Sequence, residues 1–112
     1  MKKQSLIFWI IVLIVIVIIA FLTLKNNNSV TAEQAECISS KSLIYVSRTC
    51  SHCAEQKIIL GKYYDLFNII DCIDEEEKCI QAEITGFPTW FINGKEYKGV
   101  QSWKKLKSIT GC

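Results

Sequence analysis

Two cysteines separated by two residues, Cys50 and Cys53, are the residues in this chain best placed to do chemistry. They follow the apolar, β-branched run at residues 42–46, which predicts a buried strand, and they precede residues 54–60, which predict a helix. Cys50 therefore falls where a strand leads into a helix. There the unpaired backbone N–H groups and the positive end of the helix dipole favour a thiolate. In such a position the first sulfur is activated and the second is placed to close a disulfide with it.

Two other kinds of site share this pattern. A Cys-x-x-Cys pair is also half of a zinc site, and six cysteines in a small domain can be structural crosslinks only. A zinc or copper module would use Cys50, Cys53, Cys72 and Cys79, although the last two are spaced more widely than a usual zinc pair. A disulfide-stabilised interaction domain would need no exposed thiolate. Both remain alternatives to redox chemistry.

Residues 6–24 form an apolar run with no charge and only Thr23 as a polar residue. As a helix this run covers about 28 Å, close to the hydrocarbon thickness of a bilayer. It is longer than the apolar core of a signal peptide, so we expect an uncleaved membrane anchor over residues 1–24, with a cleaved signal sequence as the alternative. Lys2 and Lys3 precede the run, and only Lys25 follows it closely. The positive-inside rule then places the N-terminus in the cytoplasm and the rest of the chain outside it, in a single-pass topology.

The part of the chain beyond residue 24 is formally neutral. Of the 13 Lys and Arg residues, only Lys2 and Lys3 precede the apolar run. The remaining positive side chains equal the 11 Asp and Glu side chains in number. This balance gives no basis for nucleic-acid binding. All six cysteines lie in the exported part, and an even number outside the cytoplasm favours disulfides.

A polar stretch without periodicity, residues 25–36, predicts a tether with room for a short helical turn near its end. Residues 37–112 are expected to form one domain, so small that burial alone gives a marginal core and crosslinks are needed. The helix after Cys53 should place Ala54 and Ile58 on one face. Residues 66–70 then predict a strand parallel to the first, which makes a βαβ unit.

The second half of the domain carries strong local signals. The acidic residues 74–77 should open a helix that reaches residue 84, with Ile80 and Ile84 facing the core. The only proline, Pro88, opens a strand, and Asn93-Gly94 predicts a hairpin turn into residues 95–98. A last helix should begin after Ser102, carry Trp103, Leu106 and Ile109, and stop at Gly111. The order βαβαββα predicts an α/β domain with a four-stranded mixed sheet.

These motifs together resemble the thioredoxin superfamily in a shortened form. Within it, the chain is most similar to the thioredoxin-like domain that is fused to, or partnered with, vitamin K epoxide reductase-type membrane oxidases. The residues that carry the resemblance are Cys50-Ser51-His52-Cys53, Asp71-Cys72-Ile73-Asp74, residues 86–95 and residues 97–102. The family often has an aromatic residue before the first cysteine and proline after it, where this chain has Thr49 and Ser51.

The position of the pair predicts Cys50 as the attacking thiolate and Cys53 as the resolving cysteine. Ser51 and His52 occupy the dipeptide that tunes thiolate stability, and His52 is expected to direct a hydrogen bond or a positive charge toward the Cys50 sulfur. The resemblance implies that Pro88 is a cis-proline facing the pair, and that the backbone at Phe87 pairs with an extended substrate segment. It also implies substrate proteins with thiols or disulfides and a membrane oxidase as partner. No cofactor or metal is expected beyond the redox-active disulfide, and the direction of electron flow stays open.

The inferred topology limits the pairing of the other four cysteines. Because the first two strands are parallel, Cys72 should emerge at the same sheet edge as Cys50, with Cys79 about one turn into the next helix. A Cys72–Cys79 bridge would close this loop beside the redox pair, as a structural clip or as an electron relay. Cys37 lies at the opposite edge, to which the last helix returns Cys112. A Cys37–Cys112 bridge would close a loop of about 76 residues and contribute roughly 4 kcal/mol to stability.

Overall fold

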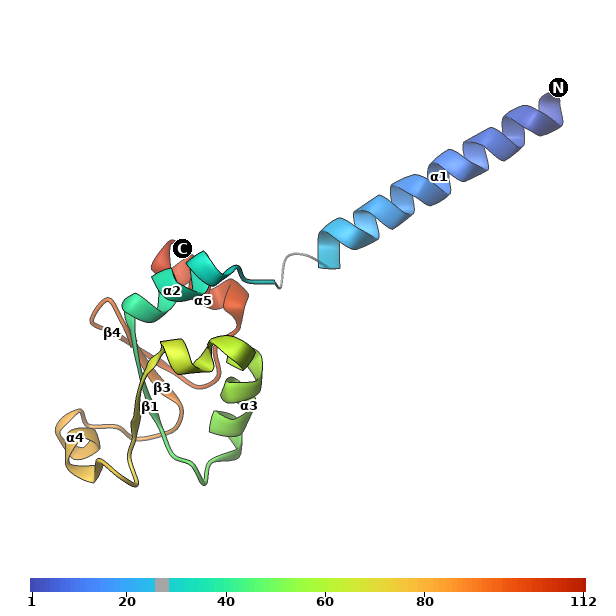
Figure 1. The fold of residues 1–112 in the computed structure, drawn as a ribbon. Helices are drawn as coiled ribbons and strands as arrows, with labels where there is room; N and C mark the ends of the chain where they lie inside the picture. The colour runs from blue at the N-terminus through green and yellow to red at the C-terminus, as the bar shows by residue number, and fades with distance from the viewer. Residues whose placement is uncertain (26–28) are drawn as a thin grey trace.

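The computed structural model describes residues 1–25 and 29–112. A long N-terminal helix leads into a small α/β domain built on one sheet (Figure 1). The elements are α1 (Lys2–Lys25), α2 (Ala32–Ser40), β1 (Ser42–Val46), α3 (Ser51–Leu60), the 3-10 helix η2 (Gly61–Leu66), β2 (Asn68–Asp71), α4 (Glu76–Gln81), β3 (Thr89–Ile92), β4 (Lys95–Lys98) and α5 (Trp103–Thr110).

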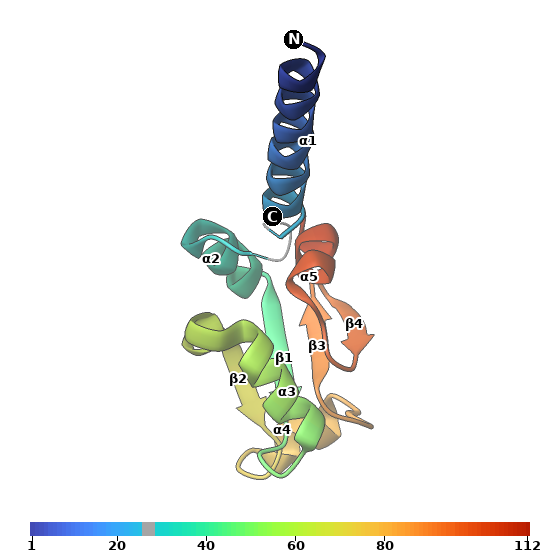
Figure 2. The ribbon, with the colours of Figure 1, turned by 90° about the vertical axis from the view of Figure 1, so that its right-hand side faces the viewer.

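The sheet has four strands in the order β2-β1-β3-β4 (Figure 2). β1 and β2 run parallel, with Ile44 opposite Ile69, whereas β3 is antiparallel to both β1 and β4. This arrangement confirms the predicted α/β class and the mixed four-stranded sheet. Because the parallel strands end at the same edge, the turn from β1 into α3 and the segment after β2 lie together there. The Cys50–Cys53 pair and the Cys72 loop therefore share one end of the domain.

The core packs aromatic side chains between the sheet and the helices. Trp90 on β3 and Leu106 on α5 are fully buried, and Phe67 meets the Trp90 ring edge-on with ring centroids 5.6 Å apart. Trp103 is also buried, and its indole N–H donates to the carbonyl of Ile59 at 2.9 Å. Both tryptophans therefore serve the core.

The C-terminal half follows its local signals closely. The hairpin turn has positive φ angles at Asn93 (51°) and Gly94 (77°), as a two-residue type I′ turn requires. The Ser102 hydroxyl accepts a hydrogen bond from the Lys105 backbone N–H and caps α5. Gly111 ends the helix in the left-handed conformation, with φ of 74°. These predictions are confirmed.

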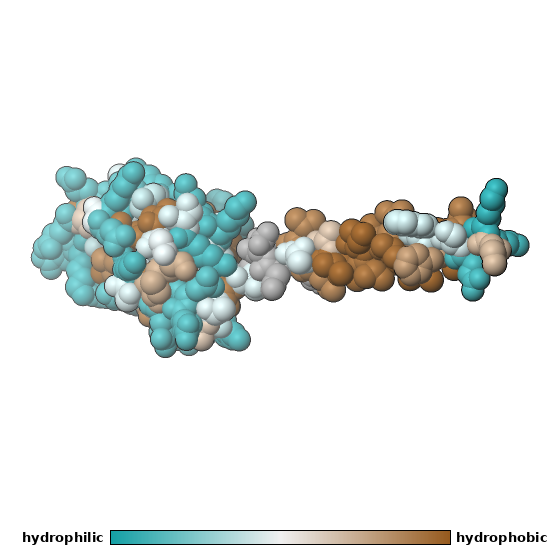
Figure 3. All heavy atoms as spheres, turned by 90° about the horizontal axis from the view of Figure 1, so that it is seen from above, coloured by the Kyte–Doolittle hydropathy of each residue, from teal (hydrophilic) through white to brown (hydrophobic). Residues whose placement is uncertain are grey.

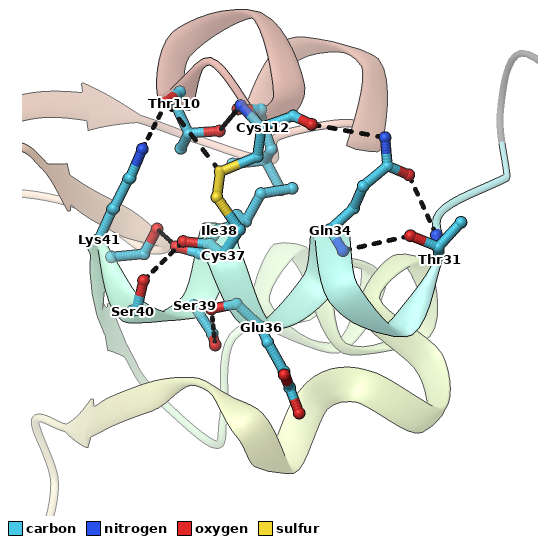
Figure 4. The surroundings of a disulfide bond; sticks show 12 residues. Thr31, Gln34, Glu36, Cys37, Ile38, Ser39, Ser40, Lys41, Thr110 and Cys112 are labelled. Carbon is cyan, nitrogen blue, oxygen red and sulfur yellow. Dashed lines mark hydrogen bonds between the residues drawn. A yellow bond between two sulfur atoms is a disulfide. The ribbon is translucent and has the colours of Figure 1, made fainter.

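The expected tether at residues 25–36 is only partly a linker. Residues 26–28 lie outside the described part of the chain, but α2 begins at Ala32 and packs on the domain. The Thr31 side chain and Gln34 form a reciprocal capping box, and Ala35 and Ile38 are fully buried. A disulfide joins Cys37 on α2 to Cys112 after α5, with Cα atoms 6.0 Å apart (Figure 4). The capping box and the burial of Ala35 and Ile38 stabilise the helix, although its sequence lacks apolar periodicity.

Two helix faces differ from the prediction. In α3 the buried positions are Cys53, Gln56 and Leu60, whereas Ile58 is 80% exposed. In α4, which ends at Gln81, the buried residue is Cys79, and Ile80 is 67% exposed. The buried faces of the two helices therefore carry Cys53, Gln56 and Cys79, where isoleucines were expected.

Helix α1 differs in character from the domain. Its most apolar 18-residue window has a mean hydropathy of 3.4, and none of that window is buried. Figure 3 shows its apolar surface beside the mostly hydrophilic surface of the domain. In the described part of the chain it is the one helix long and apolar enough to cross a membrane, and a signal sequence near the N-terminus has the same features.

Candidate active site

Cys50 stands at the start of α3 because the chain turns sharply after β1. The Cys50 backbone N–H donates to the carbonyl of Ser47 at 3.0 Å, which tightens this turn. Cys50 is the N-cap residue in extended conformation, and its carbonyl accepts the Ala54 N–H at 3.2 Å as the first helical bond. The Cys50 side chain is therefore held at the N-terminal end of α3, where unpaired amides point outward.

The Cys50 sulfur is partly exposed and faces hydrogen-bond donors. The backbone N–H of Cys53 lowers the pKa of Cys50 below its ordinary value, and the Cys53 thiol and the backbone N–H of His52 add to this effect against some desolvation. On its other side, Cys50 Sγ lies 3.7 Å from the carbonyl oxygen of Phe87. Cys50 is thus the more acidic and more accessible of the two sulfurs.

Cys53 lies one turn further along α3 and is only 8% exposed. Burial raises the pKa of Cys53 to about 11, and the Cys50 sulfur and the negative charge of Asp71 add to the shift. Both residues are free thiols in the structure. The two sulfurs of one pair therefore have pKa values displaced in opposite directions, as an attacking and a resolving thiol require.

The dipeptide between the cysteines acts through its backbone. The His52 N–H supports the Cys50 thiolate, but Nδ1 of the His52 ring lies 3.7 Å from Glu55 Oε2 on the exposed side of α3. Ser51 is exposed as the first residue of the helix. The His52 ring therefore lies beside Glu55, whereas we expected it to interact with the Cys50 sulfur.

Phe87 and Pro88 close the site from the side opposite α3. The Phe87–Pro88 peptide bond is cis, and the Pro88 carbonyl accepts the Gly99 N–H at 2.8 Å. The Thr89 hydroxyl donates to the Gly86 carbonyl at 2.7 Å, so the loop before β3 is held from both ends. The structure therefore brings Phe87 and Pro88 to Cys50, where the sequence placed them.

A cavity of about 180 Å³ opens beside the pair and reaches both sulfurs. The sequence reasoning missed its charged and aromatic lining. The Lys57 ammonium lies 5.1 Å from the centre of the Tyr64 ring, and burial raises the pKa of Tyr64. Two features of the sequence could have predicted this lining: Asp71 ends a strand parallel to β1, and Lys57 lies one helical turn after Cys53. The lining residues are Val46, Ser47, Arg48, Cys50, Cys53, Ala54, Lys57, Tyr64 and Asp71.

The segment after β2 is closed on itself by a disulfide, and three hydrogen bonds fix it to the end of β1 and the turn that follows. Cys72 and Cys79 form a disulfide with Cα atoms 5.7 Å apart. The Cys72 N–H donates to the Val46 carbonyl at 2.8 Å, and Arg48 Nη1 donates to both carboxylate oxygens of Asp74, at 2.8 and 3.0 Å. The two disulfides pair the cysteines as the topology argument expected, which leaves Cys50 and Cys53 as free thiols.

The disulfide pairing also concerns the alternative in which four cysteines bind zinc or copper. Cys72 and Cys79 are bonded to each other, so they do not offer thiolates beside Cys50 and Cys53. Within residues 1–25 and 29–112, no three or more His, Cys, Asp or Glu side chains are grouped as metal ligands would be.

The chain is similar in part to known proteins. No family model matches the chain. Over 77 residues it is 35% identical to the thiol-disulfide oxidoreductase LTO1 of Arabidopsis thaliana, a match that covers 61% of this chain and 20% of the relative. The chain thus spans about a fifth of that relative's length. It is also similar to the solution structure of oxidised thioredoxin from Plasmodium falciparum, with a TM-score of 0.41 and 20% identity, over 73% of this chain and 90% of the thioredoxin.

Proposed function

We propose that this protein is a membrane-anchored, extracytoplasmic thiol–disulfide oxidoreductase. The observation that carries the proposal is the geometry of the Cys50 sulfur, which lies at the start of α3, 3.7 Å from the Phe87 carbonyl oxygen, with Cys53 buried behind it. A thiolate stabilised by helix-end amides is both a good nucleophile at neutral pH and a good leaving group.

In the oxidising direction, a substrate thiolate attacks Cys50 in the Cys50–Cys53 disulfide and forms a mixed disulfide. The bond between the two cysteines breaks, and Cys53 leaves as a thiolate that takes a proton, because its pKa is about 11. A second substrate thiolate then attacks the substrate sulfur and releases Cys50 as a thiolate. The substrate gains one disulfide, and its two electrons stay on the reduced pair.

Substitution of each cysteine tests the roles. We expect Cys50→Ala to abolish disulfide exchange, because the accessible low-pKa sulfur is lost. Cys53→Ala should accumulate mixed disulfides through Cys50, since the thiol that resolves them is missing. Non-reducing electrophoresis and mass spectrometry of trapped species measure both effects. Accumulation in Cys50→Ala instead of Cys53→Ala would reverse the assignment.

We further propose that electrons leave the pair toward a vitamin K epoxide reductase-type membrane oxidase. Support comes from the resemblance of the motifs and from the stabilised Cys50 thiolate, which favours the reduced form and so makes the pair more oxidising. We expect a reduction potential well above the value of about −270 mV typical of thioredoxin. Equilibration with glutathione buffers measures it, and a value near −270 mV would indicate a reductase.

Two measurements separate this function from the other classes. Thiol titration with and without reductant should show one readily reducible pair and two more resistant disulfides. A stapled interaction domain would show no labile pair, and a metal module would purify with zinc or copper in stoichiometric amount. The relay alternative, in which Cys72–Cys79 exchanges electrons with Cys50–Cys53, predicts that Cys72→Ser/Cys79→Ser loses exchange with substrates.

A further inference from the structure

We propose that the loop closed by the Cys72–Cys79 disulfide is a docking surface for substrate proteins, and that it selects segments with an apolar side chain next to basic residues. We define the clip surface as Ile73, Asp74, Glu76, Glu77 and Ile80. The proposal rests on the oxidoreductase function and adds the substrate class to it.

The first argument is a pair of exposed apolar side chains that the disulfide brings together. Ile73 is 46% exposed and Ile80 is 67% exposed. Each directly follows one cysteine of a pair whose Cα atoms are 5.7 Å apart. Because consecutive Cα atoms are 3.8 Å apart, the Cα atoms of the two isoleucines lie within about 13 Å of each other. Two residues this close are within reach of a single extended segment.

The second argument is position. Figures 1 and 2 both place α4 at the end of the sheet where β1 turns into α3. The ion pair between Arg48 and Asp74 ties this loop to a residue two positions before Cys50. An extended segment advances about 3.3 Å per residue. Two backbone steps and one Arg–Asp ion pair separate Cys50 from Asp74, a distance on the order of 10–20 Å, which an extended substrate chain covers in about three to six residues.

The third argument is charge. The segment from residue 71 to 77 holds five acidic side chains, and two of its carboxylates are paired: Arg48 binds Asp74, and Lys78 binds Glu75. Glu76 and Glu77 stand four and three positions before Ile80 in α4, so they flank it on the helix surface. A partner that covers Ile80 must therefore place positive charge close to Glu76 and Glu77.

The occupant that fits these features is an extended, cysteine-containing segment of a substrate protein with an aliphatic residue and Lys or Arg nearby. Burial of one aliphatic side chain is worth about 1.4 kcal/mol or more, which corresponds to roughly tenfold in rate or affinity. Attraction between opposite charges adds a contribution to the association rate that falls as salt rises.

The test uses the oxidised full chain in detergent micelles and two cysteine peptides of equal length. One peptide carries Leu and two Lys residues three to six positions from its cysteine, and the other carries Ser and two Glu residues there. Stopped-flow measurement of thiol–disulfide exchange should give a rate constant about tenfold or more higher for the first peptide. Exchange with dithiothreitol, which has no flanking residues, monitors the intrinsic reactivity of Cys50.

Variants then locate the preference. Ile73→Ser/Ile80→Ser should remove most of the gain from Leu, and Glu76→Gln/Glu77→Gln should remove the gain from Lys together with its salt dependence. Neither change should alter the rate with dithiothreitol. Ile58→Ser is the matched control, because this side chain is 80% exposed on α3 and lies outside the clip surface.

Each outcome decides a different question. Absence of exchange with either peptide and with dithiothreitol contradicts the oxidoreductase function itself. Normal exchange without a peptide preference, or an equal loss in Ile58→Ser, overturns the docking surface alone. Size-exclusion chromatography of Ile73→Ser/Ile80→Ser should show an unchanged particle size. A shift to a smaller particle would assign this patch to self-association and would also overturn the proposal.

Discussion

At the scale of single residues, the two cysteines differ because their sulfurs meet different surroundings. Backbone N–H groups lower the pKa of Cys50, and burial raises that of Cys53 to about 11. We expect the rate of iodoacetamide alkylation to rise with pH through a midpoint below the ordinary cysteine value of about 8.5, because only the thiolate reacts. A second step, near pH 11, should belong to Cys53.

Stopped-flow alkylation of the reduced chain between pH 4 and 11 measures the lower midpoint and the onset of the second step. The Cys53→Ala variant is the control: it removes the thiol that hydrogen-bonds to Cys50 but keeps the residue-53 backbone N–H, so the midpoint should rise only partway. A wild-type midpoint at or above 8.5 would contradict the stabilised thiolate.

The same scale shows what the residue types alone did not reveal. The position of Cys50 followed from the order of strand and helix, and the structure has it at the N-cap. The source of its stabilisation did not follow, because His52 contributes a backbone N–H while its ring lies beside Glu55. Backbone donors are common to every sequence, so a residue-type argument credits the side chain instead.

At the scale of elements, α3 is held to the sheet by a buried amide. Gln56 is 1% exposed, and its Oε1 accepts from the Trp90 indole N–H at 3.2 Å and from the Gln101 backbone N–H at 2.6 Å. Its Nε2 donates to the Gln101 carbonyl at 3.0 Å. One side chain therefore joins α3 to β3 and to the segment before α5.

We expect Gln56→Leu to destabilise the domain by on the order of 3 kcal/mol, because it leaves buried donors and an acceptor without partners. Ile58→Gln, on the exposed face of the same helix, should change stability by less than about 0.5 kcal/mol. Chemical denaturation of the full chain in micelles, followed by tryptophan fluorescence, compares the two. Equal effects would mean that the buried face of α3 has been assigned wrongly.

The elements also differ in whether adjacent residues or distant contacts determine their structure. The hairpin at Asn93-Gly94, the Ser102 cap and the Gly111 stop depend on a few adjacent residues, and all were predicted. The faces of α3 and α4 were not: Gln56 is buried against partners 34 and 45 residues away in the sequence, and Cys79 is buried in its disulfide with Cys72. Only a short turn was expected where α2 forms, because two apolar residues, Ala35 and Ile38, give no periodic pattern; the helix packs against α5, η2 and β1, which lie later in the sequence.

At the scale of the whole molecule, α1 and the redox pair lie at opposite ends. The chain from α1 enters the domain beside α2 and α5, whereas the turn that carries Cys50 is at the far end of the sheet (Figures 1 and 2). Helix α1 accounts for about 36 Å of the 78 Å length of the molecule. If α1 spans the bilayer with Lys2 and Lys3 on the cytoplasmic side, Cys50 lies on the extracytoplasmic side.

We therefore expect Cys50 in the Cys53→Ala variant to react, after mild reduction, with a membrane-impermeant maleimide added to intact cells. A second variant, Gln4→Cys with both redox cysteines changed to Ala, places a thiol before the apolar run and should react only after permeabilisation. Gel shifts of the membrane fraction report both reactions. Labelling of Cys50 only in permeabilised cells would invert the topology, because a maleimide that cannot cross the bilayer reaches only the outer side. A full-length band that retains the Gln4→Cys label would establish an anchor, whereas loss of that label from a shortened, released domain would show that residues 6–24 act as a cleaved signal sequence.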